Sequence, residues 1–507
     1  MLTSALTLMV LLQKSPSGDF LAQIKKDMIP LTTTDPTRPL NDLAAMGKLL
    51  KGVKVVGMGE ATHGTSEFFA MKHRMFRYLV EEQGFTVFGL EASMPDCMAM
   101  DDYVLNGKGD PKAAVSSQGF WTWTTQEVLD LIKWMRSYNI DPKHKKKLRV
   151  VGYDMQSQVG CTLYFEDKEK ELKGETDSNY WEKISWEPLS EEERSQAKSK
   201  LDDLVKFIKL KRGEEEGRQA EFVERVFFQS ETNTWVQALR ALQMKVVPNM
   251  HETFNTAANL ITSLKLTEGP VYDALIFIDA HKNKLVDTPK EKDAVNRELW
   301  TMQAKAIREL SKGQKDSNVV RLNDQADLMD FLVFATTIPD IFRKPNANML
   351  SYRDECMATN IVEITNKLLP NQKMMAWAHN GHIMRANQGG QFKSMGHFLN
   401  ASIGKAYFPI GFAFDSGSFN AFNGSRELVV HEVKSSSTFT LDAILGQAGP
   451  ALFFSPTKSG FGKFGSRSIG ALYNKDYEDR GIMNFDPWEA YAGLIFVKKT
   501  TPTKLLK

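Results

Sequence analysis

Polar side chains follow four apolar stretches of this sequence, at the point where each stretch ends. In order along the chain, the residues at these ends are Glu60 with His63, Glu91, Asp154, and His379 with His382. In an open α/β sheet the ligand site lies beyond the carboxyl ends of the parallel strands. If the four stretches are neighbouring parallel strands, these carboxylates and imidazoles therefore meet in one place.

His63 has the context of a general base. It lies in the motif GEATHG, residues 59–64, just before a predicted helix that starts near Ser66. The positive end of a helix disfavours imidazolium, and a neutral imidazole is the form that accepts a proton from water. Glu60 can hold the other ring nitrogen, as an acidic partner does in triad-type sites. The alternative is that His63 only caps the helix and Glu60 pairs with a remote cation.

Lys72 lies within the apolar face of the same predicted helix. The residues that form this face are Phe68, Phe69, Met71, Met75, Phe76 and Leu79. A lysine there is costly unless it is paired or extends to solvent. We predict that its ammonium group pairs with Glu60 and Glu91 and stabilises developing negative charge, with extension to solvent as the equal alternative. Arg74 lies outside this face, beside Glu67, and is predicted to bind substrate.

Further residues are predicted to line the site. His379 directly follows its apolar stretch, so we favour it over His382 as the histidine that binds or protonates near the leaving oxygen. Trp121 and Trp123 are predicted to form an apolar wall for a bulky substrate, although core packing is the more common role of such residues. Asp154 completes the predicted substrate-binding set.

Several common catalytic motifs are absent from the sequence. It contains no GxSxG elbow of a serine hydrolase, no HExxH and no GxxxxGK[ST]. Glu and His residues at strand ends without these motifs favour activation of water, either by a general base or by a metal ion such as zinc or manganese. The base-catalysed route requires no cofactor.

The composition excludes several classes of function. The 507 residues allow two to four domains at roughly 100–200 residues each. A formal net charge of +2 without a long basic block gives no indication of nucleic-acid binding. Cys97, Cys161 and Cys356 are widely spaced and form neither a CxxC pair nor a disulfide framework. No interior stretch has about 18 unbroken apolar residues, the length that spans a membrane.

The beginning of the sequence has two interpretations. The apolar stretch Leu2–Leu12 resembles the hydrophobic part of a secretion signal, but a positive N-terminal region and a small-residue cleavage site are missing. A short helix packed on the body of the protein fits the pattern equally well. The sequence therefore leaves both a cytoplasmic and an exported location open.

Six apolar stretches predict the strands of a central sheet. They are residues 53–58, 86–90, 148–153, 373–378, 408–414 and 491–497. Most are continuously apolar, as in a sheet that helices cover on both faces. The first two are joined by a predicted helix over 66–82 that ends at Gly84, which together make a βαβ unit. A second helix over 125–138 is predicted to begin with a capping box of Thr124 and Glu127.

The middle of the chain is rich in Lys, Glu, Gln and Leu and predicts long helices, one of them opened by a capping box of Ser190 and Glu193. We therefore predict an α/β fold with a mixed, largely parallel sheet flanked by helices, and a helical insertion that forms a cleft. The predicted parts are an N-terminal segment, two halves of the α/β core and the helical insertion between them: residues 1–25, 26–165, 346–507 and 166–345, respectively.

Several motifs together resemble those of the erythromycin esterase family. They are GEATHG with the following Glu67, KHR at 72–74, Gly84-Phe85, Glu91, WTTQEV at 123–128, WMRSYN at 134–139, Arg353-Asp354 with MATN at 357–360, and AHNGH at 378–382. The combination of GEATHG with a downstream AHNGH is far more specific than any single motif. The resemblance extends from about residue 40 onwards and is weakest in the helical middle.

This resemblance implies a hydrolase of the macrolide-inactivating type, which opens a lactone ester with activated water and without a covalent enzyme intermediate. It implies that His63 is the base, surrounded by Glu60, Glu91, His379 and His382. Lys72 occupies a position where macrolide-active members carry Arg, and the two side chains are not interchangeable where bidentate geometry counts. The resemblance therefore indicates the type of reaction more closely than the substrate.

We predict an esterase that acts on a small-molecule ester or lactone, with His63 as general base. A metal-dependent hydrolase is one alternative, with its ligands drawn from Glu60, His63, Glu91 and His379. A non-catalytic protein that binds a small molecule in the same polar pocket is the other. No nucleic-acid partner and no membrane span are predicted, and a monomer and a homo-oligomer are equally compatible with the sequence.

Overall fold

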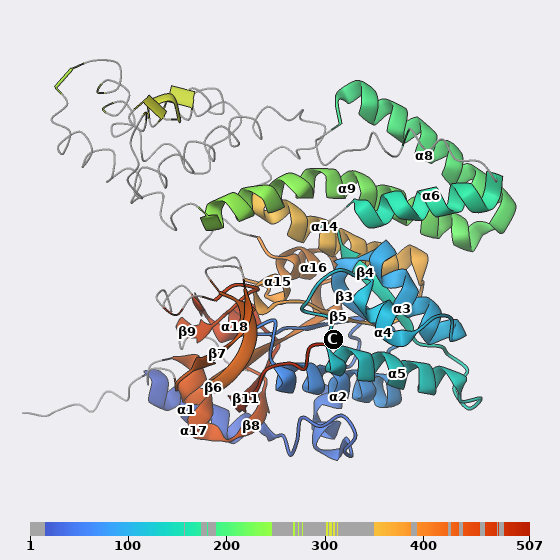
Figure 1. Ribbon diagram of the computed structural model, residues 1–507. Coiled ribbons are helices and arrows are strands. Elements are labelled where there is room, and N and C mark those ends of the chain that lie inside the picture. Colours follow the sequence, from blue (N-terminus) through green and yellow to red (C-terminus); the bar gives the residue numbers. More distant parts are fainter. Residues whose placement is uncertain are drawn as a thin grey trace, which may run out of the picture. The chain divides into compact units, whose positions relative to one another are not determined.

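The computed structural model describes most of the chain (Figure 1). The described residues are 16–156, 158–173, 189–245, 349–386, 393–423, 427–435, 440–456, 462–473 and 481–506, with isolated positions at 180, between 267 and 312, and at 475. The apolar stretch Leu2–Leu12 and most of the predicted insertion beyond residue 245 lie outside them.

A parallel block forms the centre of the sheet. It contains β6 (Tyr407–Phe422), β2 (Val55–Met58), β5 (Met374–Trp377) and β3 (Val87–Ser93), in that order across the sheet. Every residue of β2, β5 and β3 is buried. These are the continuously apolar stretches of the sequence, and burial on both faces is the reason for their composition.

Further strands extend the block on both sides. β11 (Gly493–Thr500) is parallel to β6, whereas β8 (Ala451–Phe454), β1 (Ile29–Pro30) and β7 (Leu428–Val433) pair antiparallel with β11, β8 and β6, respectively. β4 (Arg149–Asp154) lies next to β3, and β9 (Phe464–Arg467) pairs with β10 (Ile482–Phe485) in a separate sheet. The predicted mixed, largely parallel sheet and all six predicted strands are confirmed.

The predicted βαβ unit is present, with one strand inserted into it. α2 (Ser66–Gln83) connects β2 to β3 and ends at Gly84, whose φ of 72° is the left-handed conformation that glycine adopts readily. β5 lies between the two strands and is parallel to both. The polar residues after β5 are therefore flanked by those that follow the other two strands.

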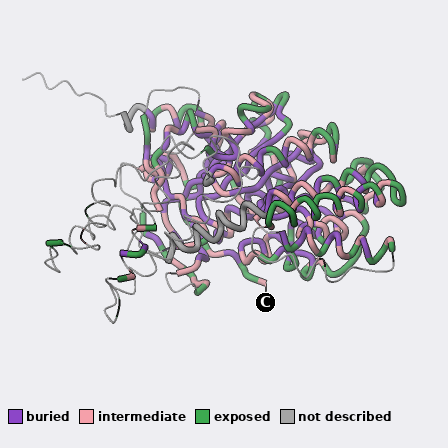
Figure 2. The backbone as a smooth tube through the Cα atoms, turned by 90° about the horizontal axis from the view of Figure 1, so that it is seen from above, coloured by how far each residue is buried: buried purple, intermediate pink, exposed green. Residues whose placement is uncertain are grey.

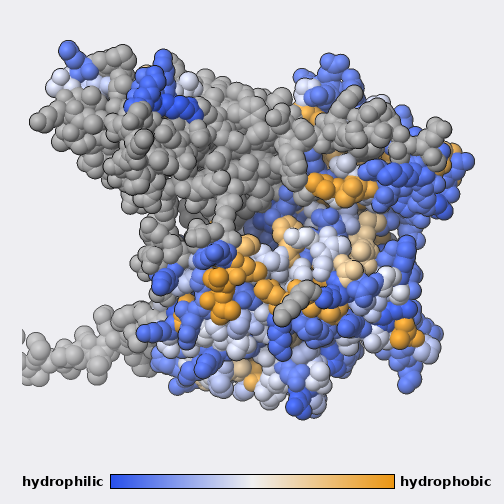
Figure 3. All heavy atoms as spheres, in the orientation of Figure 1, coloured by the Kyte–Doolittle hydropathy of each residue, from blue (hydrophilic) through white to orange (hydrophobic). Residues whose placement is uncertain are grey.

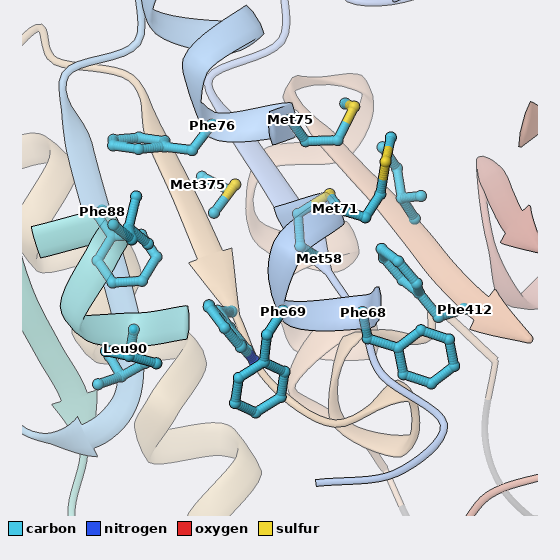
Figure 4. Close-up of a cluster of buried hydrophobic side chains, with 14 of the residues drawn as sticks. Met58, Phe68, Phe69, Met71, Met75, Phe76, Phe88, Leu90, Met375 and Phe412 are labelled. Carbon is cyan, nitrogen blue, oxygen red and sulfur yellow. The ribbon is translucent and has the colours of Figure 1, made fainter. Parts of the chain in front are cut away.

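The apolar face of α2 packs on the sheet. Figure 4 shows Phe68 and Phe412 next to each other, and their ring centroids are 5.2 Å apart at an interplanar angle of 65°. Phe76 packs against Phe88 of β3 in the same cluster, with ring centroids 5.5 Å apart. This contact area fixes the orientation of α2, and with it the loop that precedes the helix.

The other helices of the core surround the sheet. They are α1 (Pro16–Asp27), η1 (Asn41–Lys48), α3 (Met94–Asn106), α4 (Pro111–Ser116), α5 (Gln126–Ile140), η5 (Ile364–Leu368), α15 (Asn380–Ile383), α16 (Met395–Ile403), η6 (Gly404–Ala406), α17 (Leu441–Ala448) and α18 (Pro487–Ala490). Figure 1 shows α2 and α5 side by side, below β3 and β5 in that view.

The cap of α5 differs from the predicted one by one residue. Thr125 is the N-cap, and its hydroxyl accepts from the backbone N–H of Val128. The hydroxyl of Thr124 donates instead to the carbonyl oxygen of Phe120. Glu127 accepts from the hydroxyl of Ser66 at 2.6 Å, so a tertiary contact takes the carboxylate that the predicted capping box would use.

The chain divides into two compact units, residues 1–153 with 357–507 and residues 154–356. The predicted boundaries of the insertion, 166 and 345, fall inside the second unit. Its described part contains α6 (Val159–Lys173), α8 (Glu191–Arg212) and α9 (Glu214–Lys245), which pack on one another. The boundary between residues 356 and 357 falls within α14 (Met349–Glu363). The capping box of Ser190 and Glu193 is confirmed at the start of α8. The cleft between insertion and core stays a prediction.

Burial separates the described chain into interior and surface. In Figure 2 the buried stretches run through the interior of the trace and the exposed ones lie mostly on helices and turns. Figure 3 shows hydrophobic residues on one face as orange groups among hydrophilic ones. Exposed apolar side chains such as Ile140, Leu210 and Val430 are normal for a globular surface. No helix in the described residues combines the length and apolar character that crossing a membrane requires.

Candidate active site

The ends of three adjacent parallel strands position the candidate site. Met58 of β2 and Leu90 of β3 are both in register with Trp377 of β5. The residues that come after these positions are Glu60 with His63, Glu91, and His379 with His382. They lie at the same edge of the sheet, as predicted from the sequence. β3 continues to Ser93, so Glu91 is a strand residue rather than the first residue after a strand.

Glu60 is the centre of a hydrogen-bond network. Its buried carboxylate contacts three side chains: Nδ1 of His63 at 2.6 Å, Nζ of Lys72 at 2.5 Å and Nε1 of Trp377 at 2.7 Å. Burial by itself raises the pKa of Glu60, but the charge on Lys72 and the hydrogen bond with His63 outweigh it and hold this pKa below its usual value. Glu60 is therefore an anion that fixes the three groups around it.

The contact with Glu60 determines the tautomer of His63. Because Nδ1 donates to the carboxylate, the neutral ring has its lone pair on Nε2. The side chain is 15% exposed, and Nε2 bonds to no residue that the structure describes. The ring centroid of His379 is 5.1 Å from that of His63. His63 thus presents a basic nitrogen to solvent beside a second imidazole.

His379 is held as a neutral hydrogen-bond donor. Its Nδ1 accepts from the backbone N–H of Gly381 at 3.1 Å, and its own backbone N–H donates to Oε2 of Glu91 at 3.1 Å. Burial, assisted by the charges on His63 and His382, lowers the pKa of His379 to about 3. The proton of the neutral ring is therefore on Nε2, which is buried and has no hydrogen-bond partner in the described part of the chain.

Glu91 connects the two histidines of the AHNGH motif. One carboxylate oxygen accepts from the backbone of His379, and the other is 3.4 Å from Nε2 of His382. The side chain of His382 is 15% exposed. Glu91 therefore positions the start of α15, on which the orientation of both imidazoles depends.

Lys72 is buried in an aromatic cage. Its Nζ lies 4.2 Å from the ring centroid of Trp377 and 5.6 Å from those of Phe69 and Phe412. Such contacts stabilise a cation. Burial nevertheless lowers the pKa of Lys72 to about 8. The free energy that the ammonium group loses with its hydration shell exceeds the free energy that it gains from the charge and hydrogen bond of Glu60. Of the two predicted partners of Lys72, Glu60 is in contact, whereas Glu91 acts on the ammonium group only through its charge. The side chain of Lys72 does not extend to solvent.

Close packing requires two glycines of the GEATHG motif. A Cβ on Gly59 would collide with Oδ1 of Asn380, and a Cβ on Gly64 would collide with the backbone of Asn420. The side-chain amide of Asn380 in turn bonds twice to the backbone of Phe412. Its oxygen accepts from the N–H at 2.9 Å, and its nitrogen donates to the carbonyl oxygen at 2.7 Å. The loop that carries His63 is therefore packed directly against neighbouring segments of the core.

Arg74 is not part of this cluster. Its side chain has no exposed surface, and its guanidinium group pairs with Asp42 at 2.6 Å and donates to the carbonyl oxygen of Pro39. The helix face that was predicted to point away from the core is thus covered by η1 and the loop before it. The physical reason is that a buried guanidinium group needs a compensating carboxylate, which the partly buried Asp42 supplies from outside the helix. Arg74 therefore holds η1 against α2.

Trp121 and Asp154 also have partners outside the cluster. The ring of Trp121 packs edge-on against Phe422, with centroids 5.7 Å apart. Asp154 is buried, and its carboxylate accepts from the guanidinium group of Arg353 at 2.9 and 2.6 Å. Their predicted contacts with substrate stay predictions.

Trp377 belongs to the site but was not predicted from the sequence. Its indole N–H donates to Glu60, and the face of its ring contacts the ammonium group of Lys72. Its position inside a continuously apolar strand indicated only core packing, and the AHNGH motif directly after it was the available signal. Trp123 packs edge-on against both Trp377 and His63, at 5.3 and 6.4 Å between centroids, and is almost fully buried. Its surroundings favour the packing role.

Metal ligation requires free donors in a suitable arrangement. Among the described residues, no group of three or more His, Cys, Asp and Glu side chains is arranged to hold a metal ion. In the cluster itself, both carboxylate oxygens of Glu60 already have partners. One contacts His63, and the other accepts from Lys72 and Trp377. The donor set is thus organised around internal hydrogen bonds.

The chain is similar to several known proteins. It is 24% identical over 511 residues, covering 96% of this chain and 92% of the relative, to a Bacillus subtilis (strain 168) protein named "Putative hydrolase YbfO". It is 25% identical over 140 residues, 28% of this chain and 32% of the relative, to erythromycin esterase type II of Escherichia coli. The solved structure of a Bacillus cereus protein matches 97% of this chain and 99% of its own chain, at 23% identity and with a TM-score of 0.59. The structure of a succinoglycan biosynthesis protein matches with the same coverage, at 18% identity and with a TM-score of 0.56.

The erythromycin esterase family model matches residues 80–260 and 229–500. This range includes Glu91, His379 and His382 but begins after the GEATHG motif, which the full-length similarity to the Bacillus subtilis hydrolase covers instead. The family model matches well over half of the sequence, and the chain belongs to the erythromycin esterase family of hydrolases.

Proposed function

We propose that this protein hydrolyses a carboxylic ester or lactone by general-base activation of water at His63. The observation that carries the proposal is the pairing of Nδ1 of His63 with the buried Glu60 at 2.6 Å, which leaves Nε2 as the base, 5.1 Å between ring centroids from His379. Membership of the family and the similarity to an erythromycin esterase support an ester as the substrate class.

In the proposed reaction Nε2 of His63 removes a proton from water as the oxygen adds to the substrate carbonyl carbon. The imidazolium that forms is stabilised by the carboxylate of Glu60, which is already an anion before the reaction. When the tetrahedral intermediate collapses, the same proton passes to the leaving alkoxide. The products are a carboxylic acid and an alcohol, and His63 returns to its neutral form.

His379 has the complementary role of an electrophile. Its pKa of about 3 makes it a poor proton source at neutral pH, so binding of the substrate oxygen is favoured over protonation of the leaving group. Its Nε2–H is buried and without a partner among the described residues, as a donor to a developing oxyanion should be before substrate binds. Glu91 orients this imidazole through the backbone of His379.

The proposal is tested by a substrate screen. The purified protein is incubated with macrolide lactones and with simple aryl and alkyl esters, each with and without a strong chelator. We expect turnover of at least one substrate at a rate that chelation does not change. Loss of activity with chelator and its return with zinc or manganese would favour the metal-dependent route instead. Saturable binding without turnover of any ester would favour a non-catalytic binder.

A second expected result concerns the pH dependence of the esterase. Lys72 loses its proton as the pH rises through about 8, and Glu60 then loses the cation that compensates its charge. We therefore expect kcat to fall on the alkaline side near this pH. In Lys72→Arg the alkaline fall should move upward by at least about one pH unit, because a guanidinium group stays charged at a pH where an ammonium group has lost its proton. An alkaline limb at the same pH in both proteins would contradict this assignment.

A further inference from the structure

We propose that residues 501–506, hereafter the 501–506 segment, act as a positioning element for the His63 loop, residues 59–65. The catalytic consequence of this role rests on the proposed function, whereas its effect on the loop does not. The segment follows β11 and lies more than 430 positions from the loop in sequence. No motif or strand prediction pointed to it.

The segment binds the backbone directly after His63. The N–H of Thr503 donates to the carbonyl oxygen of Gly64 at 2.9 Å, and the N–H of Asn420 donates to the same oxygen at 3.1 Å. The N–H of Ser66 donates to the carbonyl oxygen of Thr501 at 2.9 Å. The peptide between Gly64 and Thr65, one residue beyond His63, is thus held by two donors, and the first turn of α2 is held by the same segment.

Two carboxylates of the helix starts reinforce this contact. Glu67, in the first turn of α2, accepts from both the N–H and the hydroxyl of Thr501 at 2.7 Å. Glu127, in the first turn of α5, accepts from the N–H of Lys504 at 3.2 Å and from the hydroxyl of Ser66 at 2.6 Å. The 501–506 segment therefore joins the starts of α2 and α5.

The segment also holds the loop on the other side of His63. The N–H of Leu506 donates to the carbonyl oxygen of Thr124 at 3.0 Å, and the N–H of Gln126 donates to that of Lys504 at 2.8 Å. Thr124 directly follows Trp123, whose ring packs edge-on against His63. Both loops that contact the imidazole thus share one backbone partner.

The side chains of the 501–506 segment differ in how far they are buried. Thr503 is buried, whereas the side chains of Thr501, Lys504 and Leu505 are exposed. Leu506 is the member of the segment that packs against the hydrophobic core, and the contacts of the segment with the His63 loop are hydrogen bonds. Removing one of them should release the His63 loop locally while the sheet stays folded, since local opening costs less than global unfolding.

The test compares two substitutions of one residue by amide hydrogen exchange of the full chain. Thr503→Pro lacks the N–H that binds Gly64, whereas Thr503→Val keeps this N–H and the branched shape. We expect the amides of residues 61–66 to exchange at least about tenfold faster in Thr503→Pro than in Thr503→Val, while those of β3 are unchanged. Lys504→Ala keeps the backbone bonds and should match the parent protein. Equal exchange in Thr503→Pro and Thr503→Val would overturn the proposal.

Glu67→Ala provides a second variant should Thr503→Pro not fold. It removes both acceptors for Thr501 at a partly exposed helix position where alanine is well tolerated. It too should accelerate exchange of the His63 loop, by less than Thr503→Pro, because the bond to Gly64 is kept. Protection equal to that of the parent protein in this variant would count against the positioning role.

The catalytic readout is the division between kcat and KM. We expect Thr503→Pro to lower kcat by about tenfold or more with little change in KM, because a misplaced base slows the chemical step. Faster loop exchange with unchanged kcat would overturn the catalytic part. Faster exchange in a protein whose parent hydrolyses no ester would refute the proposed function and support the positioning role.

Discussion

Replacement of His63 with alanine should lower kcat for any accepted ester by about 10³-fold or more, which is the range for loss of a general base within a preorganised site. The imidazole of His63 is held by the carboxylate of Glu60 at Nδ1, and its Nε2, the basic nitrogen, bonds to no residue that the structure describes. The measurement is kcat and KM with the best substrate of the screen, together with the thermal unfolding midpoint.

The fold should tolerate this substitution. Glu60 keeps its contacts with Lys72 and Trp377 when the imidazole is removed, so the buried carboxylate stays compensated. His144→Ala is the matched control, because His144 stacks on Tyr138 and bonds to its carbonyl oxygen, away from the cluster. A loss of less than about tenfold in His63→Ala would assign the base to another residue. A change in affinity alone would identify a binder.

Replacement of Lys72 with methionine should destabilise the protein by about 3–5 kcal/mol, the usual consequence of leaving one partner of a buried ion pair alone. Lys72 and Glu60 both have fully buried side chains and are 2.5 Å apart. Methionine fills much of the same space among Phe69, Trp377 and Phe412, so the lost charge rather than a cavity determines the effect. The measurement is the free energy of unfolding in denaturant at neutral pH.

The double variant Glu60→Gln/Lys72→Met separates charge from packing. Without the carboxylate the methionine is no longer opposite an uncompensated anion, and the double variant should recover most of the lost stability while remaining inactive. Lys72→Arg should retain the charge and more of the stability than Lys72→Met. A loss of less than about 1 kcal/mol in the free energy of unfolding of Lys72→Met would show that water reaches Glu60 and that the ion pair is solvated.

Residues close in sequence could be placed by pattern alone. Glu60 and His63 are three positions apart at the end of an apolar strand, so their contact needs only a tight loop before α2. The burial of Lys72 in the apolar face of the same helix likewise follows from periodicity. Local signals also identified the six strands, because continuous apolar stretches between polar turns have few other stable arrangements.

Contacts between distant segments could not be placed in this way. Nothing in β2 and β3 indicates that β5, nearly 300 residues later, lies between them, yet this order brings His379 beside His63 and Trp377 onto Glu60. The burial of Arg74 likewise had no local signal, because its partner Asp42 belongs to η1, outside the helix.

The amino-acid sequence by itself thus determined the elements and the family and supplied a set of candidate site residues, since these depend on local periodicity and on short motifs. Tertiary structure alone decided the network: which donors reach Glu60, that His379 is a neutral donor with a buried Nε2, and that residues 501–506 hold the His63 loop. The physical reason is that hydrogen bonds and desolvation depend on which groups become neighbours across the sheet, and strand order carries no local signal in the chain.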